Sequence, residues 1–434
     1  MESVKVGIIG LGTVGGGTFN ILTDNASEIT RRVGKNIEIS HIGARRDNPL
    51  ADTSNHQVSR DIWAVVNDPD VQILVELIGG TTLAKELVEA AIEQGKHIVT
   101  ANKALIAEYG NELFALAKKH HVQIAFEAAV AGGIPAIKAL REGLAGNRIQ
   151  AIAGIINGTG NFILTEMEER QAKFADVLKE AQELGYAEAD PTFDVEGVDA
   201  AHKLAILASL AFGTPLNFNA VYTEGITKIT PADIDYAREL GFKIKHLGIA
   251  QRAKSGIEMR VHPTLIPKTR LLSQVNGVMN AIEMEGDQVG PTMYYGPGAG
   301  ALPTGSAVVA DIIDVVRQMA ADASDRIPYQ AFQDDQLVDE TIVPMDEVRT
   351  GFYIRITAAD EAGVLSGITR LLSEHNINIQ AIIQKPNDKQ DDNTVPIIIL
   401  VQRSREGDVS AALEKIAALE HVNSDIIRIR AELN

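Results

Sequence analysis

The chain contains no cysteine among its 434 residues. This excludes disulfides, thiolate metal sites and any mechanism with a cysteine nucleophile. No apolar run approaches the roughly 18 residues that a membrane span needs. The first residues show no charged start followed by a long apolar stretch, which is the pattern of a secretory signal. We therefore expect a cytoplasmic protein.

Positive charge is also scarce. Forty basic residues face 58 acidic ones, and the formal net charge is −18. Nucleic acids and anionic membranes require a basic surface, so neither is an expected partner. Hydrophobic residues make up 45% and charged residues 23%, which is a globular balance. A chain of this length is expected to form two to four domains.

The N-terminal region begins with a β-branched run, Val4 to Gly10, that continues into Gly10-Leu11-Gly12-Thr13-Val14-Gly15. A strand, a G-x-G-x-x-G turn and a helix in this order predict a dinucleotide site. Gly10 would permit the tight turn, Gly12 the approach of a pyrophosphate, and Gly15 close helix packing. The alternative is an incidental glycine-rich turn.

Alternating strands and helices follow the fingerprint, which predicts a doubly wound sheet. The expected strands are 37–44, 71–77, 97–100 and 123–126, with a helix at 82–94. Arg45 and Arg46 stand where NAD enzymes usually place an acid, and they suit a 2′-phosphate. This favours NADP, with NAD possible and a solvated basic turn as the alternative.

Two further features lie just past expected strand ends, where such sheets bind ligands. Lys103 follows the strand at 97–100 and is either functional or an ordinary solvated lysine. Glu127 opens a glycine-rich loop that runs to Pro135. Its carboxylate and loop carbonyls could hold a hard monovalent cation, or the loop could be a plain turn.

The middle region carries an acidic window that ends on a lysine. A strand at 149–157, a loop at 157–161 and helices at 165–173 and 175–184 precede it. The window contains Glu188, Asp190, Asp194, Glu196 and Asp199. Carboxylates in such a group could bind a substrate ammonium.

Lys203 ends this window and opens an apolar helix. It lies four residues after Asp199, so the two share a helix face. They could form an ordinary surface pair. Burying a lysine even partly costs free energy, so a lysine in this position is expected to have a function. An unperturbed lysine titrates near about 10.4, so Lys203 could act as a proton donor without any shift.

The C-terminal region combines a glycine- and proline-rich loop at 294–307, an apolar helix at 308–319 and a linker. A compact unit with the order βαββαβ follows from residue 352, which is ferredoxin-like. We expect residues 386–393 to form a mobile hairpin tip. The open edges of so small a sheet favour pairing with a second copy.

These residues resemble the homoserine dehydrogenase family over about residues 1–320. The resemblance rests on the glycine fingerprint, Ala101-Asn102-Lys103, Glu127 to Ile134, Ala181 to Lys203, and Gly298-Ala299-Gly300. In the segment Ala181 to Lys203 the matching positions are Gly185, Tyr186, Asp190, Pro191, Asp194, Gly197, Asp199 and Lys203. The tail, with Asp360 to Leu365, is similar to an ACT domain.

The resemblance implies reversible reduction of L-aspartate 4-semialdehyde by NAD(P)H to L-homoserine, in threonine, methionine and isoleucine biosynthesis. It implies that Lys203 donates the proton and that Lys103 assists near the nicotinamide. Glu188 would bind the substrate amino group, with Asp194 and Asp199 ordering Lys203 and the substrate. The implied cofactor contacts are Gly10, Gly12, Thr13, Val14, Gly15, Arg45, Arg46, Lys103 and Gly300. The implied sodium ligands are Glu127, Val130, Gly132 and Ile134.

The resemblance also implies a domain plan. An NAD(P)-binding domain of Rossmann type would span 1–130, with helix 303–320 packing near it. An α+β catalytic and dimerisation domain would span 131–302, a linker 321–350 and the ACT domain 351–434. Threonine is the expected effector, and the expected contacts are Gly363, Val364, Leu365, Asn376 and Ile377. A homodimer or homotetramer is expected.

Two other functions compete with this interpretation. A semialdehyde dehydrogenase that phosphorylates the same substrate needs a thiol, which this chain lacks. A catalytically silent amino-acid sensor is opposed by Lys103, Glu188 and Lys203. Because the fingerprint begins almost at the first residue, we expect no fused kinase.

Overall fold

The computed structural model describes residues 3–319, 321, 326–385 and 393–433. The chain divides into two compact units. The first comprises 1–152, 201–221 and 279–340, and the second comprises 153–200, 222–278 and 341–434. The borders fall inside strand β7 (Ile149–Ile155) and helix α10 (Val198–Phe212).

The first unit contains a six-stranded sheet in the order β3-β2-β1-β4-β5-β6. Every neighbouring pair in it is parallel. This order is that of dinucleotide-binding Rossmann folds and confirms the predicted N-terminal fold. The strands are β1 (Ser3–Ile9), β2 (Asn36–Gly43), β3 (Val58–Ser59), β4 (Ile73–Glu76), β5 (His97–Thr100) and β6 (Ile124–Ala125).

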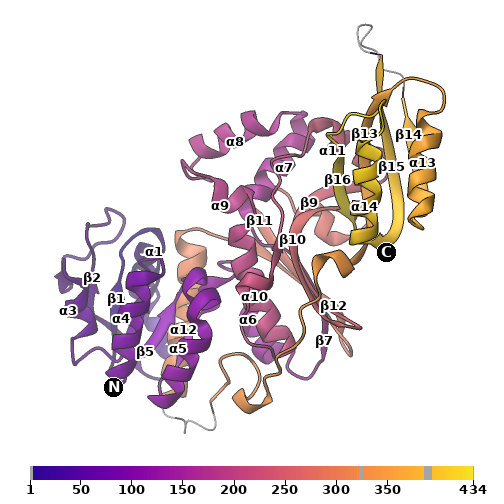
Figure 1. Ribbon diagram of the computed structural model, residues 1–434. Helices are drawn as coiled ribbons and strands as arrows, with labels where there is room; N and C mark the ends of the chain where they lie inside the picture. Colours follow the sequence, from indigo (N-terminus) through magenta and orange to yellow (C-terminus); the bar gives the residue numbers. More distant parts are fainter. Residues whose placement is uncertain (1–2, 320, 322–325, 386–392, 434) are drawn as a thin grey trace. The chain divides into compact units, whose positions relative to one another are not determined.

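Helices accompany these strands in the βα order that a parallel sheet requires (Figure 1). They are α1 (Thr13–Asp24), α2 (Ala26–Val33), α3 (Ile62–Val66), α4 (Thr82–Glu93) and α5 (Lys103–Lys119). The rest of the unit holds the short α6 (Ala136–Lys138) and the antiparallel pair β11 (Met279–Gly286) and β12 (Gly290–Pro297).

Helix α12 (Ala301–Gln318) returns from late in the chain to pack on α1. Its apolar residues share one core with β1, β4 and β5. A Cβ on Gly17 would lie 2.0 Å from the Ala301 carbonyl oxygen, and one on Gly305 would lie 2.8 Å from the Gly17 backbone. The two helices therefore meet backbone to backbone at these glycines.

The second unit is built on a long antiparallel hairpin, β9 (Phe242–Ala253) with β10 (Gly256–Pro267). Its other elements before residue 341 are α7 (Gly158–Arg170), α8 (Phe174–Glu183), α9 (Thr192–Val195), β8 (Tyr222–Thr223) and α11 (Pro231–Glu239). The apolar faces of α7, α8, α11 and β9 form one core.

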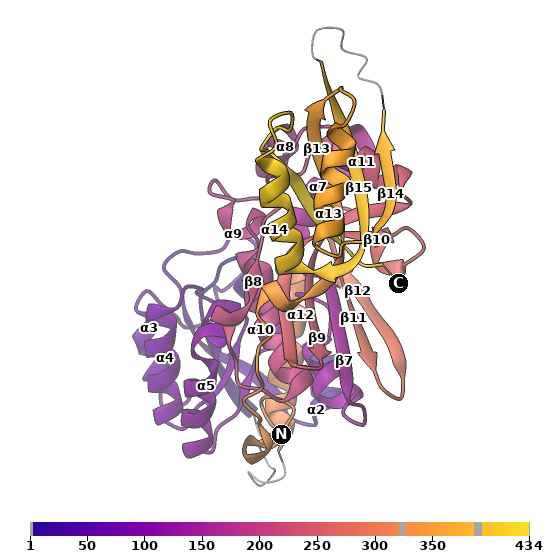
Figure 2. The same ribbon diagram turned by 45° about the vertical axis from the view of Figure 1, so that its right-hand side comes forward.

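The C-terminal part of this unit confirms the predicted βαββαβ fold. Its elements are β13 (Arg349–Ala359), α13 (Val364–Glu374), β14 (Ile379–Gln384), β15 (Thr394–Arg405), α14 (Glu406–Ala417) and β16 (Ile427–Ala431). The strand order is β16-β13-β15-β14. Helices α13 and α14 lie side by side on one face (Figure 2). The other face, through Tyr353, Ile398 and Leu400, joins the core of α7 and α11.

The edges of this small sheet differ from the expectation that both are open. Strand β16 pairs in parallel with β10 through Thr264 with Arg430 and Leu265 with Ala431. The sheet therefore continues into the β9–β10 hairpin, and β14 is its other end. Sequence patterns cannot reveal such a pairing, since it joins strands about 160 residues apart.

Two expected loops are wrong. Residues 157–161 were expected as a loop, but α7 begins at Gly158, with the Asn157 side chain capping it by accepting from Gly160 N–H at 2.7 Å. The segment 294–307 splits between β12 and α12, with Gly300 as the cap residue. In both places glycines stand inside elements that tertiary contacts stabilise. The expected hairpin tip at 386–393 lies, up to residue 392, outside the described residues.

Over the described part of the chain, no helix combines the length and the apolar character that crossing a bilayer would need.

Candidate active site

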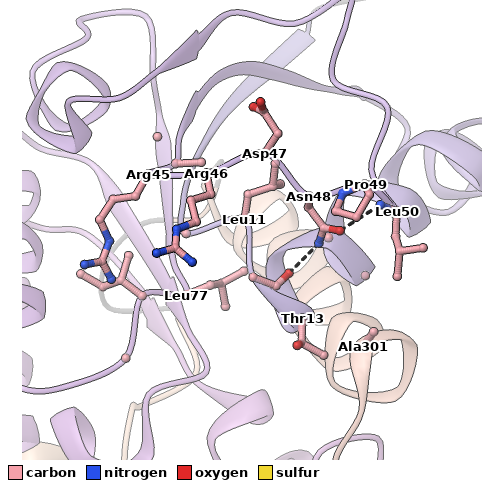
Figure 3. A pocket seen from close by; sticks show the side chains of 18 of the residues that line it. Leu11, Thr13, Arg45, Arg46, Asp47, Asn48, Pro49, Leu50, Leu77 and Ala301 are labelled. Atoms are coloured by element: carbon pink, nitrogen blue, oxygen red, sulfur yellow. Dashed lines mark hydrogen bonds between the residues drawn. The ribbon is translucent and has the colours of Figure 1, made fainter.

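A cavity of about 1120 Å³ opens at the carboxyl ends of the Rossmann strands. It is lined by the glycine turn, the segment after β2, the loop after β4 and the start of α12 (Figure 3). This is the edge at which open parallel sheets bind ligands. Its size suits a dinucleotide.

The glycine fingerprint has the local geometry that its sequence requires. Gly10 has a φ of 96°, a left-handed conformation that other residues rarely adopt. A Cβ on Gly15 would lie 2.0 Å from the Gly10 carbonyl oxygen, so α1 packs tightly on the turn. Nothing lies within 4 Å of a Cβ built on Gly12, which leaves the space above the turn open for a ligand.

Arg45 and Arg46 both line the cavity, from the segment that follows β2. Asn48, in the same segment, donates to the Gly12 carbonyl at 3.1 Å and accepts from Leu50 N–H at 2.9 Å (Figure 3). These bonds fix the arginine segment against the glycine turn. Asn48 was missed by sequence reasoning.

Of the expected cofactor contacts, Gly10, Gly12, Thr13, Arg45 and Arg46 line this cavity. Val14, Gly15, Lys103 and Gly300 do not. Gly300 is the residue before α12 and has a φ of 122°, so a residue with a side chain would be strained there.

Lys103 is the first residue of α5 and follows a turn that hydrogen bonds of Asn102 stabilise. Asn102 caps the helix by accepting from Leu105 N–H at 3.1 Å and donates to the Gly80 carbonyl at 2.6 Å. Glu76, fully buried, accepts from Thr100 and from the N–H groups of Ile78 and Gly79. Burial raises the pKa of Glu76, which the hydrogen bonds it accepts oppose. Glu76 is a second residue that the sequence analysis missed.

Glu127 lies buried in a turn of unusual backbone. Its two carboxylate oxygens accept from the N–H groups of Ile137 and Lys138, at 2.9 and 2.8 Å. Ala131 and Gly132 have φ values of 55° and 52°. A Cβ on Gly132 would lie 2.5 Å from the Gly298 carbonyl oxygen, so this loop is pressed against the start of the α12 region.

Asp311 on α12 meets the same loop. Its carboxylate accepts from Glu127 N–H at 2.7 Å, and it is 3% exposed. Burial raises the pKa of Glu127 to about 7, although the hydrogen bonds from Lys138 and Ile137 oppose this. Burial and the nearby Glu127 charge raise the pKa of Asp311 well above its usual value. A hard cation near these two buried carboxylates would stabilise their ionised forms.

The acidic window is organised around Asn157, in the second unit. Its side-chain amide donates to Asp194 at 2.8 Å and to Asp199 at 2.9 Å. Because its side-chain oxygen also caps α7, the oxygen and both N–H groups of this amide are hydrogen-bonded. Sequence reasoning named both acids but not Asn157. The small polar segment 157–161 was the available signal.

Lys203 is 9% exposed and lies one helical turn after Asp199 on α10. The residues that follow it on α10 are apolar and buried. Glu188 is exposed, in the segment between α8 and α9. Its backbone carbonyl accepts from Gln182 at 3.1 Å.

The five expected effector contacts lie at two turns of the C-terminal fold. Gly363, with a φ of 99°, precedes α13. Val364 and Leu365 pack on the core beneath α13. Asn376 has a φ of 55°, and Ile377 is buried.

The geometry thus defines a class of protein: a dinucleotide-binding Rossmann protein with a C-terminal ferredoxin-like domain. The parallel sheet and its glycine turn define the first part, and the βαββαβ unit defines the second. Family models match three consecutive regions. They describe a "Homoserine dehydrogenase, NAD binding domain" at residues 10–127, "Homoserine dehydrogenase" at 135–313 and an "ACT domain" at 352–419.

The chain belongs to the homoserine dehydrogenase family. It is 59% identical to the homoserine dehydrogenase of Pseudomonas aeruginosa over 100% of this chain and 99% of that one. It is 56% identical to the enzyme of Neisseria gonorrhoeae, again over 100% and 99%. A crystal structure of a homoserine dehydrogenase from Thiobacillus denitrificans superimposes with a TM-score of 0.95 at 55% identity, covering 100% of this chain and 99% of that one.

A more distant structure bears on the cofactor. A hyperthermophilic archaeal homoserine dehydrogenase in complex with NADPH has a TM-score of 0.61 and 28% identity, and it covers 72% of this chain and 97% of that one.

Proposed function

We propose that this chain reduces L-aspartate 4-semialdehyde to L-homoserine, reversibly, with Lys203 as the proton donor. The observation that carries the proposal is the arrangement at the start of α10. Lys203 is buried one turn after Asp199, and the Asn157 side chain donates to the carboxylates of both Asp199 and Asp194.

The proton chemistry follows from these groups. When bound, the nicotinamide supplies a hydride to the carbonyl carbon. The Lys203 ammonium gives a proton to the carbonyl oxygen as negative charge develops there, and it regains a proton from solvent. The Lys103 ammonium stabilises the same oxygen by its charge. In the reverse direction the neutral Lys203 amine accepts the hydroxyl proton.

Substrate orientation is assigned to carboxylates. Glu188 binds the substrate ammonium, and Asp194 and Asp199 orient Lys203 and the substrate. The bonds from Asn157 support this role, since they fix both acids before substrate binds.

NADP is the proposed cofactor, and sodium the proposed ion. The two arginines of the cofactor cavity suit a 2′-phosphate, and the neighbour solved with NADPH is consistent with this. Glu127 and the carbonyls of Val130, Gly132 and Ile134 would hold the ion. The buried carboxyl groups of Glu127 and Asp311 support the presence of a cation there.

Threonine is the proposed effector, acting at the ACT domain, and a homodimer or homotetramer is the proposed assembly. Strand β14, the end of the sheet order and partly exposed at Ile382, supports pairing with a second copy. Rates of homoserine oxidation with and without millimolar threonine test the effector, and light scattering tests the assembly. Unchanged rates, or a monomer, would contradict these proposals.

The central experiment is the rate of homoserine oxidation by Lys203→Ala and Lys103→Ala. Removing a general acid or base typically costs about 10²–10⁴-fold, so kcat for Lys203→Ala should fall by that order while the KM for homoserine changes little. Lys179→Ala is the matched control, because Lys179 is exposed and pairs with Glu183 on the same helix, α8. Full turnover by Lys203→Ala would refute its role.

A further inference from the structure

A small cavity lies in the second unit, far in sequence from the glycine fingerprint. Its volume is about 60 Å³. Four arginines line it, from separate parts of the chain: Arg260, Arg270, Arg349 and Arg403. Convergence of four guanidinium groups is unexpected in a chain of net charge −18.

The cavity has one buried group without a partner. Thr350 lines it, is 4% exposed, and its hydroxyl makes no hydrogen bond within the described residues. Buried hydroxyls are normally bonded, so an unpartnered one points to a group that binds there. This observation is independent of the charge.

Two of the lining arginines have no bonded carboxylate in the described chain, whereas Arg260 has acidic neighbours. Arg260 is buried, contacts Glu258 at 3.4 Å and donates to His262 at 3.0 Å. Its approach to Glu432, the one acid that lines the cavity, is 3.5 Å. Both carboxylates lie within ion-pair distance of Arg260, so its charge is balanced.

The two exposed arginines lack an acid of their own. Arg403 donates to the Arg349 carbonyl at 3.2 Å, and no carboxylate bonds to either guanidinium in the described chain. Positive charge therefore dominates at the cavity.

We propose that this cavity binds a small tetrahedral oxyanion of the phosphate class. The candidate donors belong to three strands, β10, β13 and β15, and to the segment before residue 271. A tetrahedral anion offers acceptors on several sides, whereas a carboxylate offers two oxygens in one plane. The volume equals about two water molecules, so it fits one such group and excludes a nucleotide.

The position gives the anion a structural consequence. Arg260 belongs to β10, while Arg349 and Thr350 belong to β13 and Arg403 to β15. The site therefore spans the seam where the ACT sheet joins the β9–β10 hairpin through β16 (Figure 1). An anion bound there ties the two sheets together and stabilises the folded form in proportion to its occupancy.

The test measures binding of inorganic phosphate to the full-length protein by calorimetry, in chloride buffer with saturating NADP so that the cofactor cavity is filled. Saturable binding is expected. Arg349→Gln and Arg403→Gln should each weaken it by about tenfold, because each removes a charge-assisted bond. Arg370→Gln on α13 is the matched control, since Arg370 is exposed and pairs with Glu374 on the same helix. It should bind as the unaltered chain does.

Thr350→Val gives a second, sign-based readout. Because its hydroxyl lacks a protein partner, valine should raise the unfolding temperature without phosphate and reduce the rise that phosphate causes. Glycerol phosphate serves as a monoester probe: binding with the same arginine dependence assigns a phosphoryl group, and binding of inorganic phosphate alone assigns the free ion. Absence of saturable binding, or equal binding by all variants, would overturn the proposal.

Discussion

At the scale of single residues, Asn157 links the fold to the acidic window. One side chain caps α7 and holds two carboxylates of the acidic window. A substitution there affects both the fold and the site, and a suitable control separates the two effects.

Asn157→Ala should reduce kcat/KM for homoserine by about tenfold or more, because Asp194 and Asp199 lose their common donor. It should also cost about 1 kcal/mol of stability through the lost cap. Asp61→Ala removes the cap of α3, where Asp61 accepts from Trp63 N–H, and should cost similar stability while leaving kcat/KM intact. Equal kinetic losses in both variants would show that the effect of Asn157 is only structural.

Arg45→Gln should raise the KM for NADP by roughly tenfold and leave the KM for NAD nearly unchanged, since a 2′-phosphate loses a charge-assisted partner. Initial rates with each cofactor measure this. Arg31→Gln is the control, because Arg31 is exposed on α2 and pairs with Glu28. Parallel changes for both cofactors would argue against 2′-phosphate recognition.

His246 gives a pH dependence with a definite sign. Burial lowers the pKa of His246 to about 4, so the folded state keeps it neutral while the unfolded state takes up a proton below about 6.5. Its contribution to stability is complete above pH 6.5 and is lost as the pH falls toward 4.

Glu127 has its pKa raised and acts with the opposite sign, so the total pH profile mixes both effects. The comparison with His246→Gln isolates the histidine. Between pH 7 and pH 4 the unfolding free energy of the unaltered chain should fall by about 3 kcal/mol relative to this variant, measured by urea unfolding. Parallel profiles would contradict the assignment.

At the scale of elements, α1 and α12 approach each other closely at Gly17 and Ala301. Gly17→Ala places a Cβ against the Ala301 carbonyl oxygen, so it should cost about 1–3 kcal/mol despite the better helix propensity of alanine. Thermal unfolding measures the loss. Gly12→Ala is the contrast: its Cβ has free space, so stability should hold while NADP binding weakens. Equal unfolding temperatures for the two variants would disprove the close packing.

Elements with strong local signals were predicted well from the sequence. The strand at 97–100 agrees at both ends, and the helix at 82–94 agrees to one residue. The predictions failed where glycines stand inside helices or next to them. Gly158 and Gly160 lie in the first turn of α7 because Asn157 caps it, and α12 begins directly after Gly300.

Site residues could be predicted when the motif itself holds them, as in the glycine turn and the acidic window. Asp311 could not, because it lies 184 positions from Glu127 and looks like any acid on an apolar helix. Glu76 could not be predicted either, because its sequence position indicates only the last residue of a buried strand.

At the scale of the whole molecule, the ACT domain is joined to the rest of the second unit in two ways. The sheet face opposite α13 and α14 packs on the core of α7, α8, α11 and β9, and the edge strand β16 pairs with β10. Arg355 on β13 donates to Asp233 on α11 at 2.7 Å, and Tyr353 donates to the same buried carboxylate at 3.0 Å. The two parts are therefore expected to unfold as one.

Arg355→Gln should cost about 3 kcal/mol, since it leaves the carboxylate of Asp233 buried without its ion pair. Urea unfolding measures the cost, and hydrogen exchange should show β9, β10 and β13 losing protection together. Arg370→Gln should cost little. Protection lost in the ACT strands alone would indicate an independent domain.

The pairing of β16 with β10 also sets an order of events during synthesis. One edge of β10 is covered by β8 and by β16, and β16 comes about 160 residues after β10. Until residues 427–431 have left the ribosome, part of a twelve-residue strand has its backbone groups unmatched. Exposed strand edges recruit other chains. The nascent protein is thus most prone to association late in translation. Truncation before residue 427 should therefore yield aggregates rather than a folded enzyme that lacks only the ACT domain.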